Sequence, residues 1–126
     1  MHFCLLTYLY SIYVASPALS QSVFETASEV FSTSDLASFQ ATFGLPQQQP
    51  DAINGNAVAN CAGMACQEGN LDVQYMMGIA QGATTIYWYE GQNSDPFLAF
   101  LVDIMTNQAV SKVNSISWSA TESVRQ

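Results

Sequence analysis

Hydrophobic positions follow helical spacing in the first third of the chain. Leu36, Phe39 and Phe43 stand at i, i+3 and i+7, which places them on one face of a helix. Ser34 is suited to cap the start of this helix, because its hydroxyl can accept a free backbone N–H. Gly44 can end it in a left-handed conformation. The pattern therefore predicts a helix from Ser34 to about Phe43.

A second helix is predicted from about Cys66 to Gly82, after a polar stretch at residues 47–56 that predicts a loop. Its apolar residues form a wide stripe, and the rest of the segment is mostly uncharged. A helix that is apolar nearly all round is expected to be buried. The stripe consists of Leu71, Tyr75, Met76, Ile79 and Ala80.

A run rich in β-branched and aromatic residues, 83–89, predicts a buried strand, and residues 113–118 predict another strand. Between them Asp95 is suited to cap a third helix, with Pro96 at its first position. Helices and strands that alternate in short units predict an α/β fold, with a parallel sheet and crossover helices. The core-facing side of the third helix is predicted to carry Phe97, Leu98, Leu101, Ile104 and Met105.

Composition narrows the classes of partner. The 126 residues allow one domain at most. Only 10% of the residues are charged. The chain has ten acidic residues and two basic residues, Lys112 and Arg125, which gives a net charge of −8. Binding to nucleic acid requires clustered Lys and Arg side chains, and so does a polybasic contact with a membrane. We therefore expect neither a nucleic acid nor a membrane as partner.

Three cysteines, Cys4, Cys61 and Cys66, are too few and too irregular for a complete disulfide framework. Cys61 and Cys66 are close enough for a local bridge in an oxidising compartment. The other interpretation is that all three are small buried hydrophobic residues. Their spacing fits no zinc finger and the one histidine, His2, lies at the terminus, so no metal site is predicted.

The segment 3–15 is almost wholly apolar but too short to cross a bilayer as a helix. It has the length of a signal-peptide core, and small residues follow it. No Lys or Arg precedes this segment, however, and three tyrosines interrupt it. An atypical signal and a part of the folded domain are both open interpretations.

Glu68 and Asp72 stand four residues apart on the second predicted helix, so their side chains share one face. Two carboxylates in an apolar setting are costly unless they are hydrogen-bonded or share a proton. Such a pair can supply a general base. The alternative is a solvated helix start, where acids favour the helix dipole.

The sequence around these acids resembles the sedolisin family of serine-carboxyl peptidases, which includes the tripeptidyl peptidases. The similarity is densest over residues 65–89, with the pattern Glu-x-x-Leu-Asp-Val-Gln-Tyr at 68–75. It extends over about residues 7–123. Further segments that match in order and spacing are 7–12, 31–46, 95–104 and 113–118.

The resemblance implies a subtilisin-like parallel fold in which Glu68 is the general base and Asp72 orients it. A carboxylate base is available at acid pH, where a histidine would be protonated. Ser117, Trp118 and Ser119 match the strand that lines the substrate cleft of the family. An extended peptide can pair with such a strand. The family usually has glycine in place of Ser119, and the larger side chain narrows the expected cleft.

Other parts of the family pattern are absent from the sequence. It contains neither the Gly-Asp-Ser-Gly segment, whose aspartate completes the oxyanion hole, nor the Gly-Thr-Ser segment that holds the nucleophile. The family calcium site also belongs to that missing part, so no cofactor is expected for this chain. Residues 1–126 are interpreted as an incomplete, subtilisin-like catalytic domain that is inactive alone, because a base without a nucleophile cannot perform acyl transfer.

The resemblance also sets expectations for the biological setting. A serine protease of this family hydrolyses peptides or unfolded proteins and is secreted or held in an acidic compartment, so we expect an extracellular or acidic location. The alternative function is a non-catalytic secreted protein that keeps the cleft strand and binds or interferes with peptides.

Overall fold

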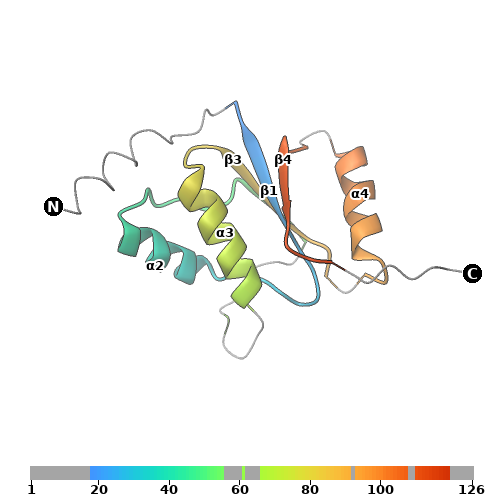
Figure 1. The fold of residues 1–126 in the computed structure, drawn as a ribbon, viewed down its shortest axis with the longest axis horizontal. Coiled ribbons are helices and arrows are strands. Elements are labelled where there is room, and N and C mark those ends of the chain that lie inside the picture. The colour runs from blue at the N-terminus through green and yellow to red at the C-terminus, as the bar shows by residue number, and fades with distance from the viewer. Residues whose placement is uncertain (1–17, 56–60, 62–65, 92, 108–109, 120–126) are drawn as a thin grey trace, which may run out of the picture.

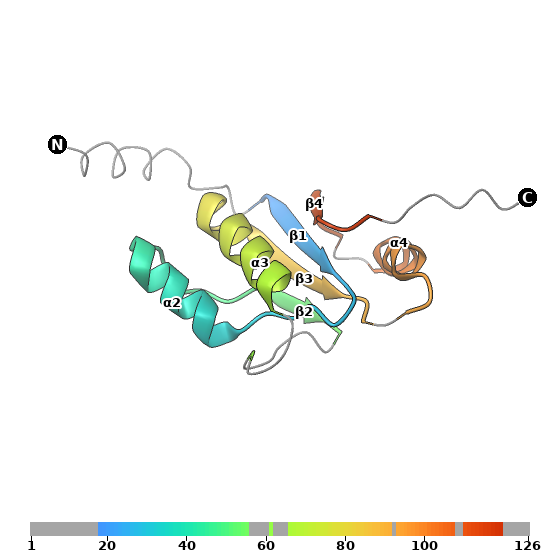
Figure 2. The same ribbon diagram turned by 60° about the horizontal axis from the view of Figure 1, so that its bottom comes forward.

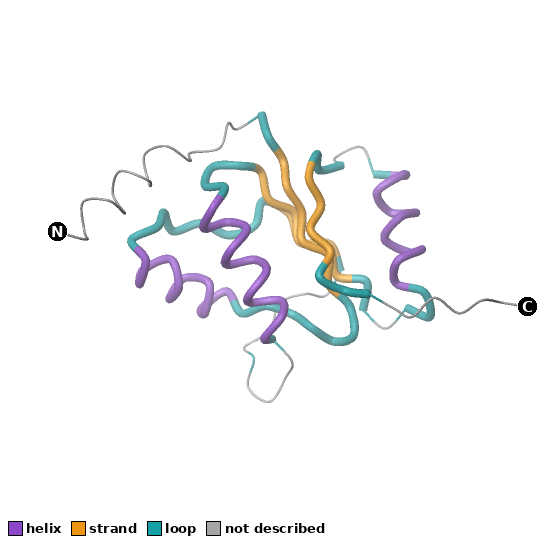
Figure 3. Tube along the Cα trace, viewed as in Figure 1, coloured by secondary structure: helices purple, strands orange, loops and turns teal. Residues whose placement is uncertain are grey.

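The structure is a computed structural model that describes residues 18–55, 61, 66–91, 93–107 and 110–119. Four strands form one parallel sheet in the order β2-β3-β1-β4, and three helices connect them (Figures 1 and 3). This architecture confirms the predicted α/β fold with crossover helices. The strands are β1 (Ser20–Glu25), β2 (Ala52–Asn54), β3 (Thr84–Tyr89) and β4 (Val113–Ile116). The helices are α2 (Thr33–Phe43), α3 (Gln67–Ile79) and α4 (Pro96–Thr106).

Helices cover both faces of the sheet. Figure 2 shows α2 and α3 together on one side of the strands and α4 on the other. Alternate residues of β1 therefore point to different helices. Val23 packs in a core cluster with side chains of α2 and α3, whereas Phe24 packs against Phe100 of α4, with ring centroids 4.9 Å apart.

The connection through α3 differs in hand from the other two. The β1–β2 connection through α2 and the β2–β3 connection through α3 lie on the same face but run in opposite directions along the strand order. The β3–β4 connection through α4 runs in the same direction as that of α3 but on the opposite face. Since about 98% of parallel crossovers share one hand, the α3 connection is the unusual one.

Helix ends agree with the predicted residues in two places and differ in two. Gly44 takes a left-handed φ of 66° after α2, and Asp95 caps α4 by accepting the Leu98 N–H at 3.0 Å. The residue that caps α2 is Ser32, not Ser34, because the Ser32 hydroxyl accepts the Asp35 N–H. Helix α3 ends at Ile79, three residues before the predicted Gly82.

Two strands were not predicted from the pattern. Strand β1 carries polar residues on both faces, so it lacks an apolar run; its buried Gln21 is satisfied by the Thr85 hydroxyl at 3.0 Å and the Met76 carbonyl at 3.2 Å. Strand β2 lies within the stretch predicted as a loop, and with three residues it is too short to show a period.

The predicted buried stripe of α3 is wrong in its orientation. Leu71, Tyr75 and Ile79 are 48%, 56% and 67% exposed, and the residues that face the sheet are Val73 and Met77. Helix α3 is apolar on two sides, so the spacing of its apolar residues does not determine which side contacts the sheet.

The same correction applies to α4. Phe100 is the buried residue of this helix, with Phe97 and Ile104 packed beside it, whereas Leu98, Leu101 and Met105 are exposed. No helix of the described residues is long and apolar enough to cross a membrane. The apolar segment 3–15, with His2 and Cys4, and the base Arg125 lie outside the described residues.

Candidate active site

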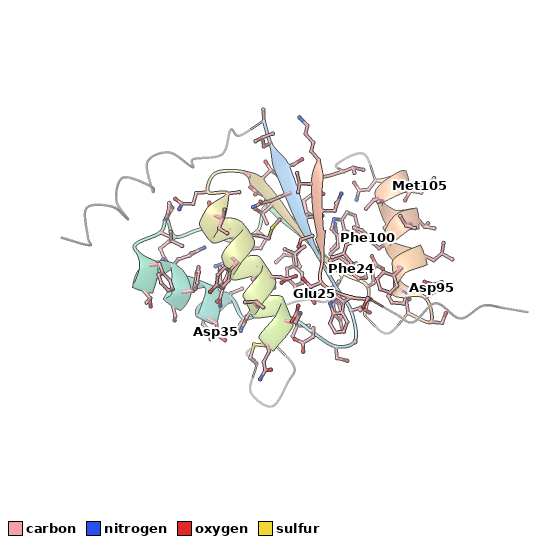
Figure 4. All side chains as sticks on the ribbon, in the orientation of Figure 1. Phe24, Glu25, Asp35, Asp95, Phe100 and Met105 are labelled. Carbon is pink, nitrogen blue, oxygen red and sulfur yellow. A yellow bond between two sulfur atoms is a disulfide. The ribbon has the colours of Figure 1, made fainter. Side chains whose placement is uncertain are left out.

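The predicted site residues gather at the edge of the sheet where the parallel strands end. Strand β1 ends at Glu25, and Ser117 and Trp118 follow directly after β4. The N-terminal half of α3 lies across this same edge, and Figure 4 shows Glu25 between the sheet and α3. The carboxyl edge of a parallel sheet is the usual place for a binding site in α/β proteins.

The start of α3 is fixed by groups from outside the helix. Cys66 is the N-cap residue but makes no side-chain capping bond, and the structure joins it to Cys61 in a disulfide with Cα atoms 5.7 Å apart. The Glu68 N–H donates instead to Oε2 of Glu29, at 3.2 Å, in the loop that follows β1.

A second contact fastens the first turn of α3 to the start of α2. Asn70 accepts the Ser32 N–H at 2.9 Å and donates to the Asp35 carboxylate at 3.0 Å. The two helix starts are therefore held together by one amide side chain, and the position of Glu68 and Asp72 depends on α2 as well as on the sheet.

Gly69 allows α3 to lie very close to the sheet. A Cβ at this position would collide with the Tyr87 hydroxyl and with the Val30 carbonyl. A glycine is therefore required between Glu68 and Asp72, because any side chain would push the first turn of α3 away from the strands.

The structure links Asp72 to the segment after β4. Oδ2 of Asp72 accepts a hydrogen bond from the Ser117 hydroxyl at 2.6 Å. Glu68 lies one turn earlier on α3, half-buried, with its backbone held by Glu29. Asp72 and Ser117 were predicted from separate parts of the sequence, and the fold brings them together.

Glu25 is the buried carboxyl group of the site. Its side chain is 0% exposed, Oε2 accepts the Trp118 indole N–H at 2.7 Å, and Oε1 has no partner among the described residues. Burial raises the pKa of Glu25 from 4.5 to about 8; the hydrogen bond from Trp118 opposes this, and the charges of Asp72, Glu68 and Glu29 add to it. Glu25 is therefore protonated in acid and through neutral pH.

Tyr87 brings a second buried polar atom to the site from β3. It is fully buried beside Gly69, and its hydroxyl has no partner among the described residues. Burial raises the pKa of Tyr87 well above its usual value, and the nearby Glu25 adds to this. The hydroxyl therefore stays protonated.

Two hollows flank the site. One has a volume of about 680 Å³ and lies beside Trp118 and Ser119, along the loop that leads into α4. The other, of about 230 Å³, runs beside Asp72 and the exposed stripe of α3, with Ser115 of β4 on its opposite wall. Ser119 thus lines a hollow but makes none of the contacts that connect Ser117 and Trp118 to the acids.

The sequence pattern did not point to Glu25. The signal that could have found it is an acid placed directly after the apolar pair Val23 and Phe24, at the end of a strand that was itself not predicted. Within the described residues, no set of three or more His, Cys, Asp or Glu side chains could hold a metal ion.

No family model matches the sequence, and no solved structure matches it. The chain is similar to tripeptidyl-peptidase 1 of Dictyostelium discoideum, with 39% identity over 111 residues. The match covers 82% of this chain but 17% of the relative, so the chain spans less than a fifth of that protein. The likeness supports a peptidase-like origin for this chain.

Proposed function

We propose that this chain forms the carboxylate part of an acid-acting serine-carboxyl peptidase site. Glu68 is the general base, and Asp72 is the carboxylate that orients it. The observation that carries this proposal is the convergence of Asp72 with Ser117, at 2.6 Å, and of Glu25 with Trp118, at 2.7 Å, on one edge of the sheet.

Each residue has a chemical task in this proposal. A carboxylate base takes the proton from a serine hydroxyl and remains available in acid, where histidine is already charged. The hydrogen bond from Ser117 holds the Asp72 carboxylate in place. An extended peptide pairs with the backbone of Ser117–Ser119, and its side chains enter the hollow beside Trp118.

The serine and the oxyanion aspartate come from sequence that this chain does not contain. Neither Gly-Thr-Ser nor Gly-Asp-Ser-Gly occurs in its 126 residues. We therefore expect no hydrolysis by this chain alone, and we place the complete site in an acidic or extracellular compartment. Proteins and peptides are the proposed substrates.

A chimera tests the assignment. Residues 18–119 replace the matching region of the Dictyostelium tripeptidyl-peptidase 1, and peptide hydrolysis is measured at about pH 4. We expect activity that falls at least ~100-fold in Glu68→Gln and in Asp72→Asn, in the range of a lost general base. Asp103→Asn, which removes an exposed acid of α4 on the opposite face of the sheet, is the matched control and should keep the activity.

Two results would contradict the proposal. One is a folded chimera that keeps its activity in Glu68→Gln, which would exclude Glu68 as the base. The other is hydrolysis by the 126-residue chain itself that disappears in Glu68→Ala, which would show that the chain holds a complete site.

A further inference from the structure

The loop between β1 and α2 has a backbone that residues with a Cβ rarely adopt. Ala27 and Ser28 are consecutive and have φ values of 52° and 71°, and neither is a glycine. Hydrogen bonds hold the loop in this form: Ala27 N–H and the Thr26 hydroxyl both donate to the Gly91 carbonyl, at 3.2 and 2.8 Å. Strain of this kind is kept where the surrounding structure requires it.

The result of this loop conformation is the position of Glu29. The Glu29 N–H donates to the Thr26 carbonyl at 2.9 Å, which closes the turn, and its carboxylate accepts the Glu68 N–H at 3.2 Å. Since Cys66 makes no side-chain cap, this carboxylate from 39 residues earlier takes the capping role. A negative charge is also favourable at the start of a helix.

We propose that Glu29 is a positioning residue for Glu68. It fixes the backbone N–H of the residue whose side chain is the proposed base, and Gly69 and Tyr87 restrain the same turn from the sheet side. This role rests on the proposed function of Glu68, but the contact itself can be measured without activity.

Amide hydrogen exchange of the full 126-residue chain tests the contact. Glu29→Ala removes the acceptor, whereas Glu29→Gln keeps an acceptor oxygen without the charge. We expect the Glu68 amide to exchange about tenfold faster in Glu29→Ala and within about threefold of wild type in Glu29→Gln, as for loss of one hydrogen bond. Asp103→Asn, which removes an exposed acid of α4 on the opposite face of the sheet, is the control and should leave the Glu68 amide unchanged. An unchanged rate in Glu29→Ala overturns the proposal.

A second measurement decides the matter if Glu29→Ala does not fold. The proton shift of the Glu68 amide is compared at one pH, near neutrality, in wild type and in Glu29→Gln. We expect this proton to lie further downfield in wild type, because a carboxylate acceptor makes a stronger hydrogen bond than an amide oxygen. Equal shifts in the two proteins overturn the proposal.

The chimera separates this proposal from the proposed function. There Glu29→Ala should lower kcat about tenfold with KM unchanged, and Glu29→Gln should restore most of it. A chimera that is inactive with Glu29 intact refutes the function of Glu68 and leaves the exchange result standing. An active chimera that is unaffected by Glu29→Ala refutes the positioning role alone.

Discussion

Replacing Glu25 with glutamine should remove much of the dependence of stability on pH. In the folded protein the pKa of Glu25 is raised to about 8, chiefly by burial, whereas its usual value is 4.5. Between these two pH values the folded protein holds a proton that the unfolded chain releases. The free energy of unfolding therefore decreases as the pH rises through this range.

The magnitude follows from the size of the shift. Each pH unit over which one proton is held only by the folded state changes the free energy by about 1.4 kcal/mol. The stabilisation from Glu25 is fully present below pH 4.5, and about 5 kcal/mol of it is lost by pH 8. The free energy of unfolding of a whole domain is typically about 5–15 kcal/mol, so this loss is a large part of it. The fold should therefore be much more stable in acid than at pH 8.

Urea denaturation at pH 4.5, 6 and 8, followed by tryptophan fluorescence, measures the effect. The glutamine of Glu25→Gln cannot ionise, but it keeps an oxygen that accepts the Trp118 N–H. The free energy of unfolding of this variant should therefore lose the part of its pH dependence that Glu25 causes between pH 4.5 and pH 8. The control is Asp35→Asn, which removes an exposed acid and should keep the wild-type slope. Equal losses in wild type and Glu25→Gln would refute the buried, protonated state of Glu25.

Three smaller perturbations test the local geometry. Gly69→Ala should lower the free energy of unfolding by about 1–3 kcal/mol, because the new methyl group collides with the Tyr87 hydroxyl and the Val30 carbonyl; an unchanged urea midpoint would show that α3 can move away. Ala27→Gly should raise that free energy by about 1 kcal/mol, since glycine accepts a φ of 52° without strain, and a lower melting temperature would argue against strain in this loop. Ser32→Ala should cost about 1 kcal/mol in thermal melts followed by circular dichroism, because it removes the cap of α2, and a matching melting curve would show that the cap adds nothing.

The helices with a clear hydrophobic period could be predicted from the sequence. Which of two apolar sides of a helix packs against the sheet could not be predicted. Helix α4 begins where Asp95 and Pro96 indicate, because capping is a local property of a few residues. Which side of α3 faces the sheet depends on contacts with strands far away in the chain. Leu71 and Val73 are equally apolar, but only Val73 lies against the sheet.

The candidate site was predictable where it depended on a motif. Glu68, Asp72, Ser117 and Trp118 could be named from the family resemblance, and the fold places them on one edge of the sheet. Glu29 could not be named, because its role depends on two left-handed residues in the loop before it, and nothing in Ala-Ser indicates such a backbone.

The strand order determines when the site can form during folding. Strands β1 and β2 do not pair with each other, because β3, which comes later in the chain, occupies the place between them. The helix that carries Glu68 and Asp72 is therefore made before the strand that completes the surface beneath it. Sheets that depend on such distant pairings fold slowly. Synthesis must reach beyond Ser117 before the sheet is finished and Asp72 has its hydrogen-bond donor, so the site is completed well after α3 has been made.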